Sequence, residues 1–340
     1  MNKLPLQTRA QILHLLCEGS SMRAISRIVG VSINTVTKLL VDAGFACMAY
    51  HDDHVRGIKA KRIQCDEIWA FYGAKDKNVK PEKKGSAGSV WTWTALDSDS
   101  KLICNWYVGG RDADCAGVFM QDLAGRLANR VQLTTDGHKA YLQAVDDAFG
   151  TDIDYAMLVK LYGESADHNG PERKYSPGVC VGARKEPIMG RPDKAAVSTS
   201  HVERANLSMR MGMRRFTRLT NAHSKKFENH CHAVALYFVY YNFVRINQAV
   251  KVTPAMAAGI ETRLWEMEDL VRMIDAFHRP KPTFAIRQLA DSSGYYVAMN
   301  PNATAPTVHI DDFATEAEAQ AWIENQSEGW FAKWAHARGM

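Results

Sequence analysis

The first 45 residues place apolar side chains at the three- and four-residue spacing of amphipathic helices. This spacing predicts three short helices, over residues 7–18, 22–28 and 33–43. Gly44 is expected to end the third predicted helix, and Ser32 is suited to cap its start. Two short helices joined by a three-residue turn that contains glycine are typical of a helix-turn-helix. The pattern therefore predicts an N-terminal all-α domain over residues 1–45.

The third predicted helix has one apolar and one polar face. The apolar positions that we expect to be buried are Ile33, Val36 and Leu40. The opposite face of a helix at this place in a helix-turn-helix meets DNA bases and phosphates. The residues that we expect to contact DNA there are Ser32, Asn34, Thr35 and Lys38. A three-helix bundle without DNA contact is the alternative.

From residue 63 the apolar period becomes that of extended chain. The pattern predicts, in chain order, three strands, a helix, a strand, a helix and a strand, over residues 63–72, 89–96, 102–108, 115–129, 131–135, 138–149 and 155–162. This is the order of a ribonuclease-H-like sheet, although other α/β domains share it. We expect an α/β fold with a ribonuclease-H-like core over residues 63–250, joined to the first domain by a basic linker over residues 46–62.

The second half of the chain is expected to contain less sheet. Residues 163–199 are rich in glycine, proline and charge and are predicted to form a loop, and a long basic helix begins at Thr199. Helices are also expected over residues 229–247 and, after Pro254, as a helical extension over 251–282. The tail, residues 283–340, is predicted to be a small acidic β-β-α appendage, with strands at 295–299 and 307–310 and a helix over 316–323.

Charge is distributed unevenly along the chain. Residues 1–62 contain nine lysines and arginines against four acids, and residues 204–226 contain seven basic residues and no acid. Residues 261–340 carry twelve acids against seven basic residues. Two basic zones indicate a polyanionic partner, with nucleic acid as the first candidate, whereas ordinary solvated faces are the alternative.

Composition limits the class of protein. A chain with 46% hydrophobic and 23% charged residues is expected to fold as a globular protein. Its longest apolar run, residues 233–244, is about half the roughly 20 residues that a bilayer span needs. The seven cysteines include no CxxC pair, which disfavours a zinc ribbon or a disulfide scaffold. We therefore expect a cytoplasmic protein with no membrane partner.

Three acidic residues lie at positions of the predicted strands and helix that suit a metal-binding site. Asp66 lies inside the first apolar strand, Asp136 directly follows the strand 131–135, and Glu203 lies near the start of the basic helix. Magnesium prefers oxygen ligands, and two such ions about 3.5–4 Å apart can promote displacement at phosphorus. Glu67, next to Asp66, points to the opposite face of the strand, where we expect a surface role. His201 is expected to lie on a different side of the helix from Glu203.

The segments around these acids resemble three motifs of the insertion-sequence-one family of bacterial DDE transposases. The segment 66–75, Asp-Glu-Ile-Trp-Ala-Phe-Tyr-Gly-Ala-Lys, resembles its first-aspartate motif, and 134–141, Thr-Thr-Asp-Gly-His-Lys-Ala-Tyr, its second. The segment 202–210, Val-Glu-Arg-Ala-Asn-Leu-Ser-Met-Arg, is similar to its glutamate helix. The resemblance covers about residues 60–250, with the three acids in the family's order, 70 and then 67 residues apart.

The resemblance implies a ribonuclease-H-like fold and a metal-dependent enzyme that binds the ends of a DNA insertion element and catalyses strand cleavage and strand transfer. It implies that Asp66, Asp136 and Glu203 are the catalytic residues and hold Mg²⁺ or Mn²⁺, as two ions. Arg210 would take the place of the family's basic residue two helical turns after the glutamate. Its neighbours Arg204 and Arg214 are also expected to bind DNA. The implied partners are double-stranded DNA, as element ends and target, and further copies of the chain assembled on it at the nucleoid.

Other functions remain open at this stage. A sequence-specific DNA-binding regulator, or an inactive transposase relic, would use the helix-turn-helix and keep the core as a scaffold. A nuclease of the same fold without strand transfer is a further alternative. The carboxylate triad favours an enzyme, because a protein that only binds DNA gains nothing from acids that face phosphates.

Overall fold

The computed structural model describes residues 3–163, 179–217, 221–278, 283–289, 293–300 and 307–336. The chain forms two compact units, Met1–Ile274 and Asp275–Met340, and each is described by itself.

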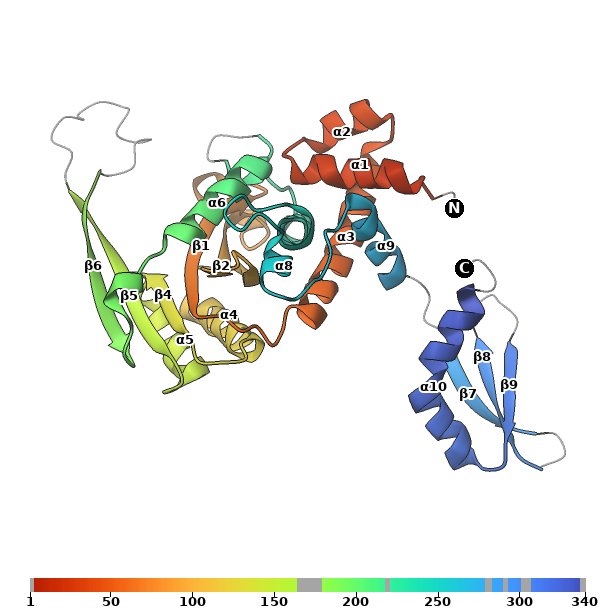
Figure 1. Cartoon of the computed structure of the whole chain (residues 1–340). Coiled ribbons are helices and arrows are strands. Elements are labelled where there is room, and N and C mark those ends of the chain that lie inside the picture. The colour runs from red at the N-terminus through yellow and green to blue at the C-terminus, as the bar shows by residue number, and fades with distance from the viewer. Residues whose placement is uncertain are drawn as a thin grey trace. The chain divides into compact units, whose positions relative to one another are not determined.

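The first unit begins with three helices, α1 (Leu6–Cys17), α2 (Met22–Val29) and α3 (Ile33–His54) (Figure 1). The Ser32 hydroxyl caps α3 by accepting a hydrogen bond from the backbone N–H of Asn34 at 3.1 Å. Gly30 ends α2 with a φ of 72°, a left-handed conformation that favours glycine. The axes of α2 and α3 differ by 114°, within the range of roughly 90–120° for such helix pairs.

Helix α3 is longer than the sequence pattern predicts. It continues past Gly44 to His54, so that residues 46–54, predicted as linker, are helical. Gly44 lies in mid-helix against α7 (Phe227–Val239), where a Cβ would lie 2.3 Å from the Cβ of His232. Its role is therefore close helix packing. Ile33 also differs from expectation, because it is 40% exposed instead of buried.

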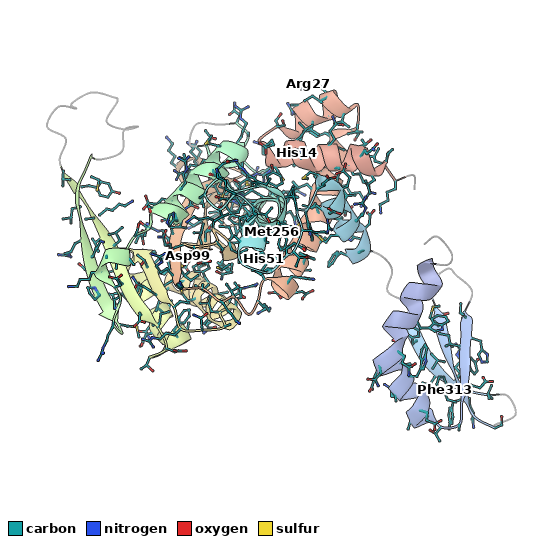
Figure 2. All side chains as sticks on the ribbon, in the orientation of Figure 1. His14, Arg27, His51, Asp99, Met256 and Phe313 are labelled. Atoms are coloured by element: carbon teal, nitrogen blue, oxygen red, sulfur yellow. The ribbon has the colours of Figure 1, made fainter. Side chains whose placement is uncertain are left out.

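The far end of α3 packs on the sheet. The His51 side chain is 2% exposed, and its Nε2 lies 3.1 Å from the carbonyl oxygen of Ile103 (Figure 2). Burial lowers the pKa of His51 to about 3, so its ring is neutral at physiological pH. The N-terminal helices and the sheet thus share one hydrophobic core.

A mixed six-stranded sheet forms the centre of the first unit, in the order β3-β2-β1-β4-β5-β6. Its strands are β1 (Arg62–Tyr72), β2 (Gly88–Asp97), β3 (Ile103–Gly109), β4 (Gln132–Asp136), β5 (Asp154–Gly163) and β6 (Val179–Met189). The pairs β1–β4 and β4–β5 are parallel, and the other neighbours are antiparallel. This α/β arrangement is compatible with a ribonuclease-H-like core.

Strand β6 corrects the predicted loop over residues 163–199. It pairs with β5 at the edge of the sheet, and its side chains are largely exposed, with Val181 at 67%. An edge strand exposed on both faces needs no alternation of apolar residues, so the hydrophobic pattern of the sequence does not predict it. Residues 164–178 of that predicted loop lie outside the described residues.

Helices cover both faces of the sheet (Figure 1). They include α4 (Ala113–Arg126), α5 (Ala140–Phe149), α6 (Ser200–Gly212) and α7, and the shorter α8 (Pro254–Ala257) and α9 (Met267–Phe277) follow later in the chain. Helix α7 continues as a π-helical turn, Tyr240–Val244, and 3₁₀ turns lie at Asp76–Asn78, Pro81–Lys83, Lys194–Ala196 and Arg214–Phe216. The largest fully buried side chains include Trp93, Phe119, Tyr141 and Tyr155, which fill the space between the sheet and these helices.

The second unit has a three-stranded antiparallel sheet and one helix. These are β7 (Thr283–Gln288), β8 (Tyr295–Asn300), β9 (Val308–Phe313) and α10 (Glu316–His336). Trp322 of α10 packs with Phe313 of β9 in a separate small core (Figure 2). The β-β-α prediction lacked β7, an edge strand with no buried residue. The expected boundary at residues 280–282 lies outside the described residues.

Of the helices in these described ranges, none is by itself both long and apolar enough to span a membrane. Helices α2 and α3 meet that criterion only when taken as a pair, across their 114° bend.

The close packing at Gly44 gives a stability prediction. Gly44→Ala should destabilise the protein by about 1–3 kcal/mol, because the new Cβ meets backbone and Cβ atoms of His232 that cannot rotate away. Gly117→Ala in α4 is the matched control, since its Cβ meets no atom within 4 Å and should gain about 0.5–1 kcal/mol. Urea unfolding of both variants measures the difference. Equal effects of the two substitutions would contradict the packing role of Gly44.

Candidate active site

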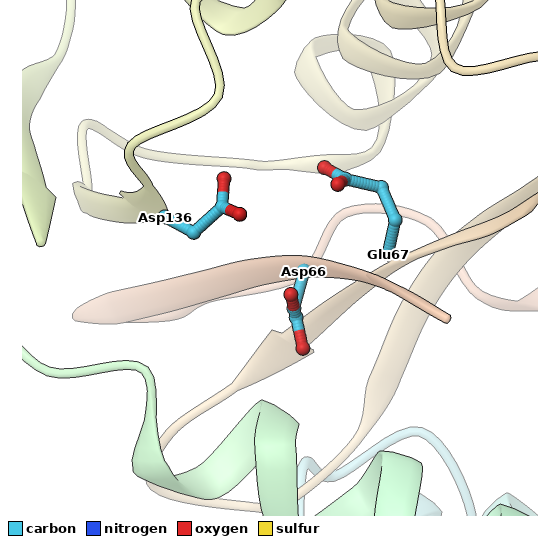
Figure 3. A group of neighbouring side chains, drawn as sticks. All are labelled: Asp66, Glu67 and Asp136. Carbon is cyan, nitrogen blue, oxygen red and sulfur yellow. The ribbon is translucent and has the colours of Figure 1, made fainter. Parts of the chain in front are cut away.

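Strand register brings two of the predicted acids together. In the parallel pair β1–β4, Gln64 lies opposite Thr134, and continuing that register by two residues sets Asp66 opposite Asp136. One carboxylate oxygen each from Asp66, Glu67 and Asp136 lie within 4.8 Å of one another (Figure 3). We call these three residues the carboxylate cluster. Its donors are all oxygen atoms, the ligands that Mg²⁺ and Mn²⁺ prefer.

Glu67 belongs to this cluster, and the expected surface role is wrong. Its side chain is fully buried, because helices cover both faces of the central strand β1. Burial raises the pKa of Glu67 to about 7, and the charge of Asp136 adds to the effect. A hydrogen bond with the Tyr141 hydroxyl and the charge of Arg111 act against this rise.

Arg111 holds Glu67 and Asp136 on one side of the cluster. Its Nε donates to Oε2 of Glu67 at 3.0 Å, and its Nη2 donates to Oδ2 of Asp136 at 3.4 Å. The guanidinium carbon lies 4.7 Å from the ring centre of Trp91, a cation–π contact. The other Asp136 oxygen accepts from the backbone N–H of His138 at 2.9 Å. These contacts fix the Asp136 carboxylate, and no local sequence signal marks Arg111 for this role.

Asp66 faces helix α6 on the other side of β1 (Figure 3). Asn206 of α6 donates to its Oδ2 at 2.9 Å. Burial, together with the charges of Asp136 and Glu203, raises the pKa of Asp66 to about 6, against the hydrogen bond from Asn206. Asp66 is thus the carboxylate that connects the cluster to the helix of Glu203.

Gln64 fixes the start of α6 on β1. Its buried Oε1 accepts from the backbone N–H groups of His201 and Val202, at 2.8 and 3.1 Å. These two donors belong to the first turn of α6, where backbone N–H groups have no partner inside the helix. Gln64 and Asp66 are two residues apart and so share one face of β1. The strand that carries Asp66 therefore also positions the helix turn that carries Glu203.

Glu203 lies outside the carboxylate cluster. Its Oε1 accepts from Lys160 Nζ of β5 at 2.5 Å and from the hydroxyl of Thr199. Its charge still raises the pKa of Asp66. The structure thus joins Asp66 and Asp136 as neighbours, and holds Glu203 beside them in an ion pair that the sequence does not indicate.

The predicted DNA-contacting residues of α3 lie at its exposed N-terminal end. Asn34 and Lys38 are exposed and Thr35 is half-buried. Lys38 pairs with Asp42 at 2.7 Å, an exposed ion pair of small energy that a phosphate could replace. Ser32 is engaged as the helix cap.

The three predicted arginines of the basic segment lie in different places. Arg210 is exposed and lies seven residues, or about two helical turns, after Glu203, on the same face of α6. Arg204 lines a cleft of about 380 Å³ together with Lys101 and Arg245. Arg214 lines a larger hollow of about 560 Å³ on the side of the N-terminal helices.

Comparisons with known proteins add little to this geometry. No family model matches the chain, and no curated protein matches its sequence. Among solved structures, the chain is similar to one in the crystal structure of the Mos1 strand transfer complex, with a TM-score of 0.21 and 12% sequence identity, over 70% of this chain and 76% of that chain. A likeness with so low a TM-score carries no argument, so the function is inferred from this chain's own residues.

The raised pKa values of Asp66 and Glu67 predict a pH-dependent stability. A carboxyl whose folded pKa exceeds its unfolded value of about 4 binds extra protons when folded, so the protein loses stability as pH rises from about 4 to about 7. Asp66→Asn keeps an acceptor for Asn206 and removes the charge. We expect it to melt higher than wild type at pH 8, by roughly 2–4 °C for each kcal/mol gained.

This gain should grow between pH 4 and pH 6 and then stay constant, because Asp66 is fully ionised above its folded pKa of about 6. Asp53→Asn, at an exposed position of α3, is the control and should show no such growth. Thermal melts of both variants and wild type across this pH range make the measurement. A lower melting temperature for Asp66→Asn at pH 8 would contradict the repulsion inferred for the cluster.

Proposed function

We propose that this chain is a DNA transposase of the DDE type, similar to the insertion-sequence-one family, which cuts and joins DNA strands with divalent metal ions. The observation that carries the proposal is the carboxylate cluster on the neighbouring strands β1 and β4, bordered by the helix of Glu203. Buried acids at this spacing repel one another, and a binding role alone gives no reason to gather them.

The acids would contribute to a metal site in two ways. Asp66 and Asp136 would hold Mg²⁺ or Mn²⁺ between the strands, and Glu203 would complete the site from α6 after exchanging its Lys160 partner for the ion. The ions would activate the attacking oxygen and stabilise the leaving one. In the reaction, water or a DNA 3′-hydroxyl forms a new bond to phosphorus, while the bond between phosphorus and the old 3′-oxygen breaks.

Protein groups orient the acids for this reaction. Asn206 directs Asp66, while Arg111 and the backbone of His138 direct Asp136. Glu67 would act on the metal site from the buried side, either as a ligand or by fixing Arg111. Lys160, once released from Glu203, would lie free to face a substrate phosphate.

The N-terminal helices would supply recognition of the element ends. The 114° angle between α2 and α3 and the exposed Asn34 and Lys38 support insertion of the start of α3 into the major groove. Double-stranded DNA is the proposed partner, both as element end and as target, with further copies of the chain assembled on it.

A DNA-binding regulator or inactive relic is the second candidate. The ion pair between Lys160 and Glu203 favours it, because a neutralised Glu203 outside the cluster would suit a protein that has no need of a third ligand. The two candidates differ in whether Glu203 is needed for chemistry.

Cleavage separates the candidates. The substrate is a plasmid that carries the DNA flanking this chain's coding sequence, incubated with Mg²⁺ or Mn²⁺ and analysed for nicks and joined strands. Asp66→Asn, Asp136→Asn and Glu203→Gln should each reduce nicking by at least about 10³-fold while DNA binding persists, because each removes a metal ligand. Glu67→Gln should reduce it by about tenfold, and Asp53→Asn should leave it unchanged. Normal nicking by Glu203→Gln would leave the proposal without its third carboxylate.

Binding by α3 is tested separately. Lys38→Gln should weaken binding to all sequences, whereas Asn34→Ala and Thr35→Ala should change the preference among sequences. Ser32→Ala, which removes the cap, controls for a loosened helix start and should cost about 1 kcal/mol of stability. Selection from a random DNA library, followed by binding at several salt concentrations, gives the readout. Unchanged preference in both Asn34 and Thr35 variants would remove α3 from recognition.

A further inference from the structure

A second charged surface lies in the first unit, apart from the carboxylate cluster. Three hollows, of about 560, 610 and 370 Å³, share lining residues. Asn221 and His223 line the first and second, and Gly73 and Asn78 line the second and third. The hollows therefore adjoin one another on the surface, and we call the three together the basic groove.

Each part of the basic groove carries cations. Arg23, Arg214 and Arg215 line the first hollow, and Lys225 lines both the first and the third. No acidic residue lines any of the three hollows within the described part of the chain. A concave surface with charges of one sign concentrates the field, so the groove attracts polyanions.

The loop that forms the far end of the groove adds four lysines: Lys75, Lys77, Lys80 and Lys83. Its acid Asp76 is turned away, because its carboxylate accepts from the backbone N–H of Ser89 at 2.7 Å and from the Ser89 hydroxyl. Glu82 is exposed but does not line the groove. The positive charge of this loop is thus presented on the groove side.

Arg215 is held in place without a counterion. Its Nη1 donates to the Ser224 hydroxyl at 2.7 Å and to the carbonyl oxygen of Asn229 at 3.1 Å, and no acid of the described residues pairs with it. Burial lowers the pKa of Arg215 to about 10, so it stays charged at neutral pH. A half-buried charge without a counterion is costly, and an anion in the first hollow would compensate it.

The groove offers no platform for unstacked bases. Its aromatic residue, Phe71, is 5% exposed, with the His223 ring stacked on it at 4.6 Å and Lys75 Nζ 5.4 Å from its centre. Proteins that grip single strands expose aromatic rings on which bases stack. Among its described residues the groove thus has many cations and little exposed ring surface, which fits the phosphate backbone of a duplex.

The near end of the groove meets the helices proposed to read DNA. Arg23 of α2, and Ile33 and Thr37 of α3, line the first hollow. Ile33 and Thr37 flank Asn34 in the same first two turns of α3. A duplex held at the start of α3 therefore has a charged surface to follow along the first unit.

We propose that the basic groove binds the phosphate backbone of duplex DNA, independently of sequence, from Arg23 through Lys225 to Lys80. The choice of DNA as the polyanion rests on the proposed function. The groove would hold the element end or its flank while the carboxylate cluster acts elsewhere on the same molecule. It thereby adds a binding site that neither α3 nor the acids supply.

The test uses the full chain with Arg23, Lys80 and Lys225 all changed to Gln. Arg23 lines the first hollow, Lys80 the third, and Lys225 both. The probe is a 30-bp duplex of mixed sequence, measured by fluorescence anisotropy at several salt concentrations without divalent ions. We expect Kd at about 0.1 M salt to rise at least about tenfold, and the slope of log K against log salt to become shallower by about 2–3, since each lost phosphate contact removes about 0.9.

The matched control is Lys59, Lys61 and Lys251 all changed to Gln, which removes the same charge from exposed positions outside the groove. Equal loss of duplex affinity in both triple variants would mean that only the overall charge of the protein matters, and would overturn the proposal. Tighter binding of wild type to a single strand of the same length would overturn the choice of duplex. Thermal melts of both variants exclude a folding defect.

Asp66→Asn separates this proposal from the proposed function. With its groove intact, it should bind the mixed duplex as tightly as wild type while failing to nick. If wild type itself failed to nick but the groove variants still lost duplex binding, the groove would stand without the transposase. If wild type nicked while groove and control variants bound alike, the groove proposal alone would fail.

Discussion

The central constraint on this molecule is the repulsion among acids that its sheet forces together. The parallel register of β1 and β4 sets Asp66 against Asp136, and Glu67 adds a third oxygen within 4.8 Å. Burial weakens solvent screening, so the pKa values of Asp66 and Glu67 rise to about 6 and about 7. The surrounding structure compensates for this cost.

The compensation comes from elements far apart in the sequence. Arg111, before α4, neutralises the side of Glu67 and Asp136, and Asn206 of α6 supplies a hydrogen bond to Asp66. Lys160 of β5 neutralises Glu203, whose charge raises the pKa of Asp66. Asn206 lies on a helix that packs on β1, Lys160 lies on β5 beyond β4, and Arg111 lies in the loop between β3 and α4. The fold of the sheet and its connections therefore brings together both the acids and the groups that offset their repulsion.

The sequence predicts the buried part of this arrangement well and its edges poorly. Strand β1 and its neighbours β2 to β5 appear at nearly their observed bounds, because buried strands carry apolar runs that local pattern reveals. Edge strands β6 and β7 bury little, so the pattern predicted a loop or nothing. Helix α3 was cut short at Gly44, since the reason for that glycine is His232, 188 residues later.

The same distinction holds for the site. Asp66 and Asp136 could be found from strand position and motif, because both lie where an α/β sheet places functional groups. Glu67 was misjudged, since alternation along a strand gives the face of a side chain and not whether helices cover that face. No local sequence pattern marks Arg111, Lys160 or Gln64, because the role of each depends only on which residues the fold brings near it.

Four carboxylates face two cations at the site, which leaves an excess negative charge that suits a divalent ion. Under the proposed function, a DNA phosphate would be repelled from the acids until that charge is balanced and would be attracted to the basic groove, so the charge distribution would separate holding DNA from cutting it.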